Sequence, residues 1–256
     1  MKTIKLISFT VIYFFLSGAN AQSWINISGQ HQHKKNFVYD SQSINVYPGL
    51  VTFNTRYDIP GTKLFFFHKL AYLCGSKEIH GIASAVEADK NSVPNLISEV
   101  SDYGVAEHMI VPGLINPISK FCGTRVSRNN LEIPISASND EITFMLPRET
   151  VISGFRVVIW QKKYSYTKEP IMLNGEEYKV KGEVIFNKKI LRNIGYELFS
   201  WEYDCSTKST AILSSVKYDV HGNVTSSSDF SNRKSFSIVV PGSVGQTNLE
   251  FACGLR

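Results

Sequence analysis

The chain has 256 residues, of which 43% are hydrophobic and 19% are charged, and its formal net charge is +5 at pH 7. This length allows one large domain or two small ones. The charge excess is too mild to indicate a nucleic-acid partner, and it supports only a weak attraction to acidic surfaces.

The N-terminus has the three parts of a secretory signal peptide. Two lysines among the first five residues form a basic start, an apolar run covers residues 6–16, and small residues follow up to Ala21. An apolar run of this length is too short for a transmembrane helix, which takes roughly 20 residues. We therefore expect cleavage between Ala21 and Gln22, which leaves a mature chain without an integral membrane segment.

Strand patterns dominate the next part of the chain. The stretch Leu50–Tyr57 is rich in β-branched and aromatic residues and follows a Pro-Gly turn, which predicts a strand. A second strand is expected around Ile82–Ala88. The segment Leu114–Cys122 contains Pro117, so any helix here is expected mostly at its end.

A polar stretch divides the chain at residues 124–140. It carries Pro134 and lacks sustained periodicity, so it is expected to be a linker. It separates a first module at 22–123 from a second module at 141–256.

The second half repeats the strand-rich pattern and ends in a predicted helix. Phe155–Trp160 corresponds to the strand at Leu50–Tyr57, and alternating residues from Ile212 to Val220 predict a half-buried strand. His221–Asn223 is a predicted turn that leads into a partner strand from Val224. Near the C-terminus, helical spacing begins after Ser243, which is a good N-cap, and stops at Gly254.

The four cysteines form two equally spaced pairs. Cys74 and Cys122 are 48 positions apart, Cys205 and Cys253 are also 48 apart, and the pairs are offset by 131 (205 − 74). An even number of cysteines in an exported chain favours disulfides, whereas no pair has the C-x-x-C spacing of a zinc site.

Other residues recur at nearly the same offset as the cysteines. Ile110–Gly113 recurs as Val239–Gly242, and a tyrosine lies two positions before Cys74 and before Cys205. This pattern is typical of a tandem duplication. If each copy folds on its own, the pairing is Cys74–Cys122 and Cys205–Cys253. The expected fold is α+β, with two tandem modules, each an antiparallel sheet whose C-terminal helix is tied by a disulfide.

The second half resembles the surface-adhesin protein E family of Gram-negative bacteria. The segments that carry the resemblance are Trp201–Cys205, Leu213–Tyr218, Val239–Gly245 and Phe251–Cys253, and the family's opening resembles Ser23–Trp24 and Val38–Ile44. The resemblance implies a small sheet-plus-helix fold with a disulfide and export to the periplasm or cell surface. The family takes its name from a member that binds host extracellular-matrix and serum proteins.

Histidines are the main candidates for a metal site. His31 and His33 form an H-x-H pair that, with His68, His80 or His108, would suit a metal ion. A polar loop is the simpler interpretation, since H-x-H alone is weakly specific. We expect no metal and no cofactor.

Two further sequence patterns, an S-x-x-K match and a set of aromatic residues, are interpreted as structural and not as functional sites. Ser165–Lys168 fits S-x-x-K, but the companion motifs of penicillin-binding enzymes are missing. Phe65–Phe67 and Trp201 are expected in the core, although an exposed side of the Phe run would mark an interface.

The sequence as a whole favours a non-enzymatic protein. No nucleophile elbow, phosphate loop or zinc-protease motif occurs, so no catalytic residue is assigned. We expect an exported binding or adhesion-type protein, periplasmic, surface-bound or secreted, with host matrix or envelope proteins as partners. The alternatives are a periplasmic structural or assembly protein, and a metal-dependent enzyme that uses the histidines of the first module.

Overall fold

The computed structural model describes residues 24–26, 38–87, 102–103, 108–109, 112–137, 141–165, 171–173, 176–178, 186–187, 191 and 193–256. The expected signal peptide with its Ala21–Gln22 junction, and the pair His31 and His33, lie outside the described residues. In the part of the chain that is described, no helix has the length and apolar character needed to cross a membrane.

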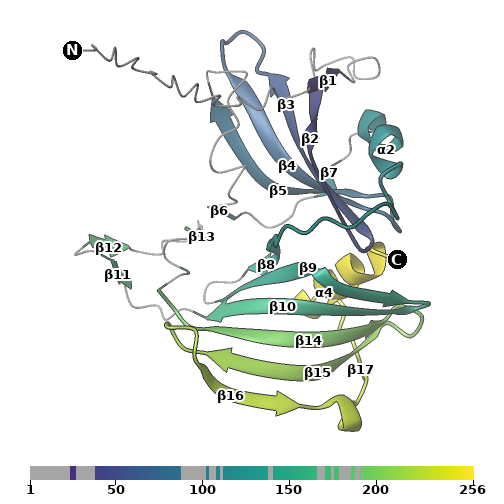
Figure 1. The fold of residues 1–256 in the computed structure, drawn as a ribbon, viewed down its shortest axis with the longest axis vertical. Helices are drawn as coiled ribbons and strands as arrows, with labels where there is room; N and C mark the ends of the chain where they lie inside the picture. Colours follow the sequence, from purple (N-terminus) through teal and green to yellow (C-terminus); the bar gives the residue numbers. More distant parts are fainter. Residues whose placement is uncertain are drawn as a thin grey trace, which may run out of the picture.

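The described chain is mostly antiparallel β-sheet, with two large sheets and two short strand pairs (Figure 1). The first sheet contains, in spatial order, β1 (Trp24–Asn26), β2 (Val38–Tyr47), β3 (Leu50–Asp58), β4 (Phe65–Leu73), β5 (Ile79–Glu87) and β7 (His108–Met109). Since these strands pair in chain order, hairpins make most of the connections. The strand predicted at Leu50–Tyr57 is confirmed as β3.

The second sheet is built in the same manner. Its strands, in spatial order, are β16 (Val224–Asp229), β15 (Ser209–Tyr218), β14 (Tyr196–Asp204), β10 (Arg156–Ser165), β9 (Glu141–Ser153) and β8 (Ile133–Ala137), and β17 (Ser237–Ile238) pairs with β15. The shorter strands form two pairs, β11 (Ile171–Leu173) with β12 (Glu176–Tyr178), and β13 (Phe186–Asn187) with β6 (Asp102–Tyr103). The second of these pairs joins segments from the two halves of the chain.

The turn predicted at His221–Asn223 lies between β15 and β16. The carboxylate of Asp219 accepts hydrogen bonds from the backbone N–H groups of His221 and Asn223, each at 2.8 Å. Gly222 has a φ of 82°, which other residues rarely adopt. These local features explain why this turn could be predicted from sequence.

The two helices differ in how well the sequence predicted them. Helix α4 (Val244–Gly254) begins as expected, with the Ser243 side chain accepting a bond from the Gln246 N–H at 3.3 Å. Helix α2 (Pro112–Ser119) begins earlier than expected and contains Pro117. A proline past the first turn normally disfavours a helix, so the burial of Leu114 and Ile118 against the first sheet outweighs the local preference here.

The expected linker at 124–140 is too long. Residues Ile133–Ala137 form β8, which pairs with β9, and Ile133 and Ile135 are buried. Pro134 is compatible with this strand because β8 lies at the edge of its sheet, where a missing donor costs little. Ser127 is also ordered, since it exchanges two hydrogen bonds with Val46 of β2.

The structure contains two disulfides, Cys74–Cys122 and Cys205–Cys253, the pairing that the spacing favours. Cys74 directly follows β4 and Cys205 directly follows β14. Cys122 lies just after α2, whereas Cys253 lies inside α4. Each bridge therefore fastens a helix to the end of a strand.

The two halves share a backbone hydrogen bond and a backbone conformation at corresponding positions. The cysteine N–H after each strand donates to the turn before the neighbouring strand, from Cys74 to the Gly49 carbonyl and from Cys205 to the Phe155 carbonyl, both at 2.9 Å. The loops that follow contain Lys77 and Lys208, 131 positions apart (208 − 77), both with positive φ.

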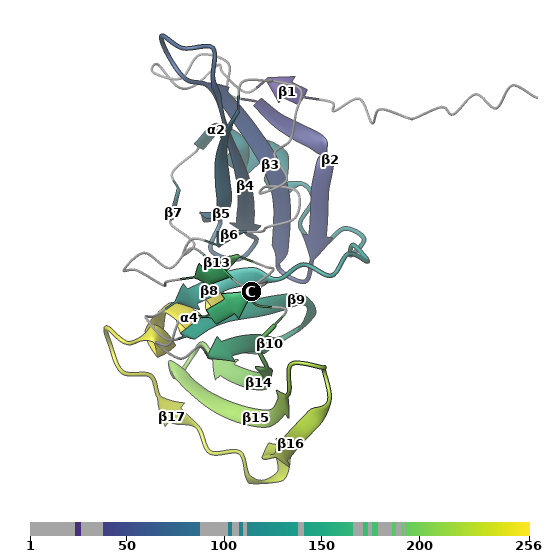
Figure 2. The ribbon, with the colours of Figure 1, turned by 90° about the vertical axis from the view of Figure 1, so that its left-hand side faces the viewer.

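The buried side chains form two clusters of different kinds. The smaller lies between α2 and the first sheet, and includes Leu114, Ile118, Phe53 and Leu70. The larger combines both sheets with α4. Its members from the first sheet are Tyr47, Leu50, Ala71, Leu73 and Ile82, and those from α4 and the C-terminus are Leu249, Phe251, Ala252 and Leu255. The two halves thus share a core, and α4 lies at their junction (Figures 1 and 2).

Backbone contacts bring the C-terminus against the first sheet. The N–H groups of Gly75 and Ser76 both donate to the Gly254 carbonyl, each at 3.0 Å. A Cβ at Gly75 would lie 1.5 Å from the Arg256 carbonyl oxygen, and one at Gly49 would lie 2.1 Å from that of Leu255. Glycine is required at both positions because the two backbones approach so closely.

Gly75→Ala is expected to destabilise the protein by about 2 kcal/mol, because the added methyl group forces the C-terminal backbone away from the first sheet. The urea midpoint of the mature protein measures this loss. Gly245→Ala in α4 is the control and should not lower the stability, because the nearest atom to the added Cβ is the Ser243 hydroxyl oxygen at 3.3 Å and alanine is the better helix former. Equal stability of the two variants would contradict the close approach.

Removing either disulfide is expected to cost a similar amount, because both close loops with a sequence separation of 48. The chain-entropy relation gives about 4 kcal/mol for such a loop. The double variants Cys74→Ser/Cys122→Ser and Cys205→Ser/Cys253→Ser, compared by urea unfolding, control for one another. Peptide mass mapping without reduction checks the pairing, and any crossed pair would contradict it.

Candidate functional site

A cavity of about 500 Å³ opens at the junction of the two halves. The first half supplies the residues around the β4–β5 connection, β8 supplies one wall, and α4 supplies the other. The lining side chains that bear on its chemistry are Ser76, Glu78, His80, Ile135, Thr247, Glu250 and Phe251. Its volume is within the range of about 300–1,000 Å³ that is typical of small-ligand sites.

Local hydrogen bonds hold the first-half wall in place. In the β4–β5 connection, the Leu73 N–H donates to the Glu78 carbonyl and the Lys77 N–H donates to the Leu73 carbonyl, both at 2.9 Å. Lys77 adopts a φ of 62°, which closes this tight loop. Ser76 and Glu78 therefore lie in a hairpin loop whose backbone these hydrogen bonds hold in place.

The α4 wall is held by both its cap and its disulfide. Ser243 caps the N-terminal end and Cys253 joins the other end to Cys205 beside β14. Between these anchors, Glu250 accepts a hydrogen bond from the Gln246 amide nitrogen at 2.6 Å. The carboxylate of Glu250 thus has its hydrogen-bond donor on its own helix, and no ion pair to it occurs within the described ranges.

One histidine links the two walls. His80 Nε2 lies 3.7 Å from a Glu78 carboxylate oxygen, and its ring meets the Phe251 ring edge-on with centroids 5.7 Å apart. Ser76, Glu78 and His80 thus line the same cavity, with the imidazole between Glu78 and the aromatic ring of Phe251, in contact distance of both.

Two other candidate histidines lie in the first sheet, His68 on β4 and His108 on β7. The ring of His68 is buried between Tyr57 and Phe66, with centroids 5.7 and 4.5 Å away. His108 pairs with His80 through the backbone of β7 and β5. Among the described residues, no three His, Cys, Asp or Glu side chains are grouped as metal ligands.

The aromatic candidates lie mainly in the core. Phe67 is fully buried, and Phe66 stacks on Tyr57 with centroids 5.4 Å apart. Trp201 is half-buried against the larger core. The start of the S-x-x-K match, Ser165, donates a long hydrogen bond to Glu141 at 3.4 Å, and the rest of that match lies outside the described residues.

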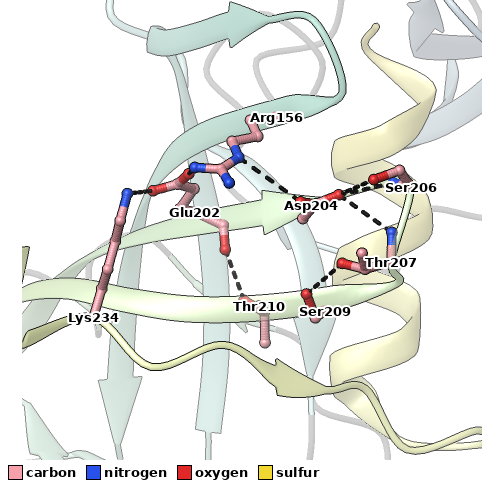
Figure 3. A network of polar contacts seen from close by, with 8 residues as sticks. All are labelled: Arg156, Glu202, Asp204, Ser206, Thr207, Ser209, Thr210 and Lys234. Atoms are coloured by element: carbon pink, nitrogen blue, oxygen red, sulfur yellow. Dashed lines mark hydrogen bonds and ion pairs between the residues drawn. The ribbon is translucent and has the colours of Figure 1, made fainter.

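A polar network on the second sheet escaped the sequence analysis (Figure 3). Glu202 on β14 is only 5% exposed, and its carboxylate receives hydrogen bonds from Arg156 at 3.0 Å and from Lys234 at 2.9 Å. These partners are 46 and 32 residues away in the chain, so no local pattern indicates the contact. The network fastens the segment after β16 to the sheet.

The end of β14 carries a second acidic residue of this network. Asp204 lies 3.7 Å from Arg156 and accepts bonds from the Ser206 hydroxyl and from the backbone of Ser206 and Thr207 (Figure 3). The hydrogen bond from the Ser206 side chain is the main cause of a lowered pKa at Asp204. Next to it in the chain, burial raises the pKa of Tyr203, whose hydroxyl accepts a bond from Gln161. Each polar group is internally satisfied, which is typical of a structural network.

Glu202→Ala is expected to lower the free energy of unfolding by about 1–2 kcal/mol, because Arg156 and Lys234 lose a buried partner but remain partly hydrated. Urea unfolding measures the change. Glu149→Ala removes an exposed carboxylate from β9 and should shift the free energy by less than about 0.5 kcal/mol. A Glu202 variant as stable as this control would show that the network contributes nothing.

Comparison of the chain with family models, with curated proteins and with solved structures finds no match.

Proposed function

We propose that this protein is an exported, non-enzymatic binding protein whose ligand enters the cavity at the junction of its two halves. The observation that carries the proposal is that both halves build this cavity, with Glu78 and His80 on one side and Glu250 and Phe251 on the other. Sites between structural units are a preferred location for ligands.

The halves are best interpreted as related modules. Both have a disulfide with a sequence separation of 48, a left-handed lysine in the following loop, and the same hydrogen bond from cysteine to the neighbouring turn. When a module is duplicated, the second copy provides a surface that can face the first copy, and a binding site can form between the two. In this case the helix α4 provides the second wall.

Export and attachment to a bacterial envelope form part of the proposal. Two disulfides favour an oxidising compartment, and the expected signal peptide provides the route. The resemblance to the surface-adhesin protein E family supports the periplasm or surface of a Gram-negative bacterium, with matrix or envelope proteins as partners.

The hydroxyl, carboxylate and imidazole groups of the cavity suit binding better than catalysis. Ser76 offers a hydroxyl, Glu78 and Glu250 offer carboxylates, and Ile135 and Phe251 offer apolar surface. A few polar groups beside apolar side chains are the usual composition of a binding pocket.

Filling the cavity tests the proposal. Thr247→Trp places an indole in the cavity, so binding of the mature protein to purified matrix or envelope proteins should weaken at least tenfold. Thr225→Trp makes the same substitution on exposed β16 and should bind as wild type. Biolayer interferometry against a panel of both protein classes provides the measurement. The proposal fails if wild type binds no member of the panel, or if Thr247→Trp binds as well as wild type.

A further inference from the structure

We infer that the junction cavity takes a compact organic cation, the ammonium or guanidinium side chain of a lysine or arginine on an exposed polypeptide segment. This inference rests on the proposed function and names the chemistry of its ligand. It follows from the charge, the walls and the rigidity of the cavity.

The lining contains two acidic side chains, both exposed to solvent, one of which also lies 3.7 Å from His80 Nε2. Glu78 and Glu250 contribute carboxylates, and no Lys or Arg among the described residues forms an ion pair with either. This sign is opposite to the net charge of +5 on the whole chain. A cationic ligand would therefore gain favourable contacts here, whereas an anion would meet two carboxylates.

Two basic side chains lie near the C-terminal part of α4 but do not line the junction cavity. The Arg256 guanidinium lies over the Phe155 ring, 4.5 Å from its centroid. Lys208 lines a separate, smaller cavity of about 240 Å³, which shares Glu250 with the junction cavity but lacks Glu78. The described lining of the junction cavity therefore contains no lysine or arginine.

The apolar part of the lining suits the alkyl stem of such a side chain. Ile135 on β8 and Phe251 on α4 are both buried and both line the cavity. Lysine and arginine bury their methylene groups against apolar surface while their charged ends meet polar groups. A small inorganic cation would gain nothing from these walls.

The carboxylates are also carried on elements that cannot move apart freely. Glu78 follows a loop whose Gly75 and Ser76 N–H groups donate to the Gly254 carbonyl, and Glu250 is one turn before that carbonyl on α4. The disulfide at Cys253 anchors the same turn. A site held in this way loses little conformational entropy when the ligand binds.

Blocked amino acids test the charge requirement on the full mature chain. Nα-acetyl-arginine amide and Nα-acetyl-lysine amide should bind at least tenfold more tightly than Nα-acetyl-norleucine amide, which has a similar stem without the charge. Nα-acetyl-glutamate amide should not bind. Titration followed by NMR chemical shifts suits the weak affinities expected of such small probes. Equal affinity for the norleucine and lysine probes would overturn the inference.

Variants then locate the site. Glu78→Gln/Glu250→Gln should weaken binding of the arginine probe at least tenfold, and Glu149→Gln should leave it unchanged. Thermal unfolding checks that both variants are folded. An unchanged affinity in the double variant overturns the assignment of the cation to this cavity.

Two further comparisons distinguish failure of the inferred ligand class from failure of the proposed function. Tighter binding of free 1,4-diaminobutane than of the lysine probe would assign the site to polyamines and overturn the choice of a polypeptide side chain. If Thr247→Trp abolishes partner binding while Glu78→Gln/Glu250→Gln retains it, the cavity is the binding site but its ligand is not a cation. If Thr247→Trp binds its partner as wild type does, the proposed function itself fails.

Discussion

The structure depends on the contact between the C-terminal end of α4 and the first sheet. One carbonyl, that of Gly254, receives two backbone N–H groups from the β4–β5 loop, and the adjacent Leu255 is buried in the core that both sheets share. The disulfide at Cys253 fixes the same turn of helix to the second sheet. This end of α4 therefore joins the two halves, and it also forms one wall of the cavity between them.

The same contact makes the two helices unequal, although both follow a sheet and both are tied by a disulfide. Helix α2 covers only the first sheet, where Leu114 and Ile118 complete the smaller core. Helix α4 contributes Leu249 and Phe251 to a core that includes residues of both sheets. Helix α4 consequently packs against its own sheet and also joins the two halves. A substitution in α4 should therefore affect the whole molecule, whereas one in α2 should affect mainly the first half.

Local and periodic features were predictable from the sequence, and contacts between distant segments were not. The turn at Gly222 and the cap at Ser243 depend on residues within four positions of one another, and the disulfide pairing followed from equal spacing. Strand β8 was mistaken for linker because five residues around a proline are too short for a clear alternation. The cavity could not be foreseen, since Glu78 and Glu250 are 172 positions apart (250 − 78) and only the shared core brings them together.

The edges of the sheets offer fewer advantages for recognition than the junction does. Strand β8 carries Pro134, β1 has three residues, and the exposed strand β16 is mostly serine and threonine. An added strand would thus find a missing donor, a short template or little apolar surface. The junction is instead lined by Ile135 and Phe251 as well as by Glu78 and Glu250, on elements that the Gly254 carbonyl and the Cys253 disulfide hold together. Because elements joined in this way lose little entropy when a ligand binds, the proposed site lies at the junction and not at an open sheet edge.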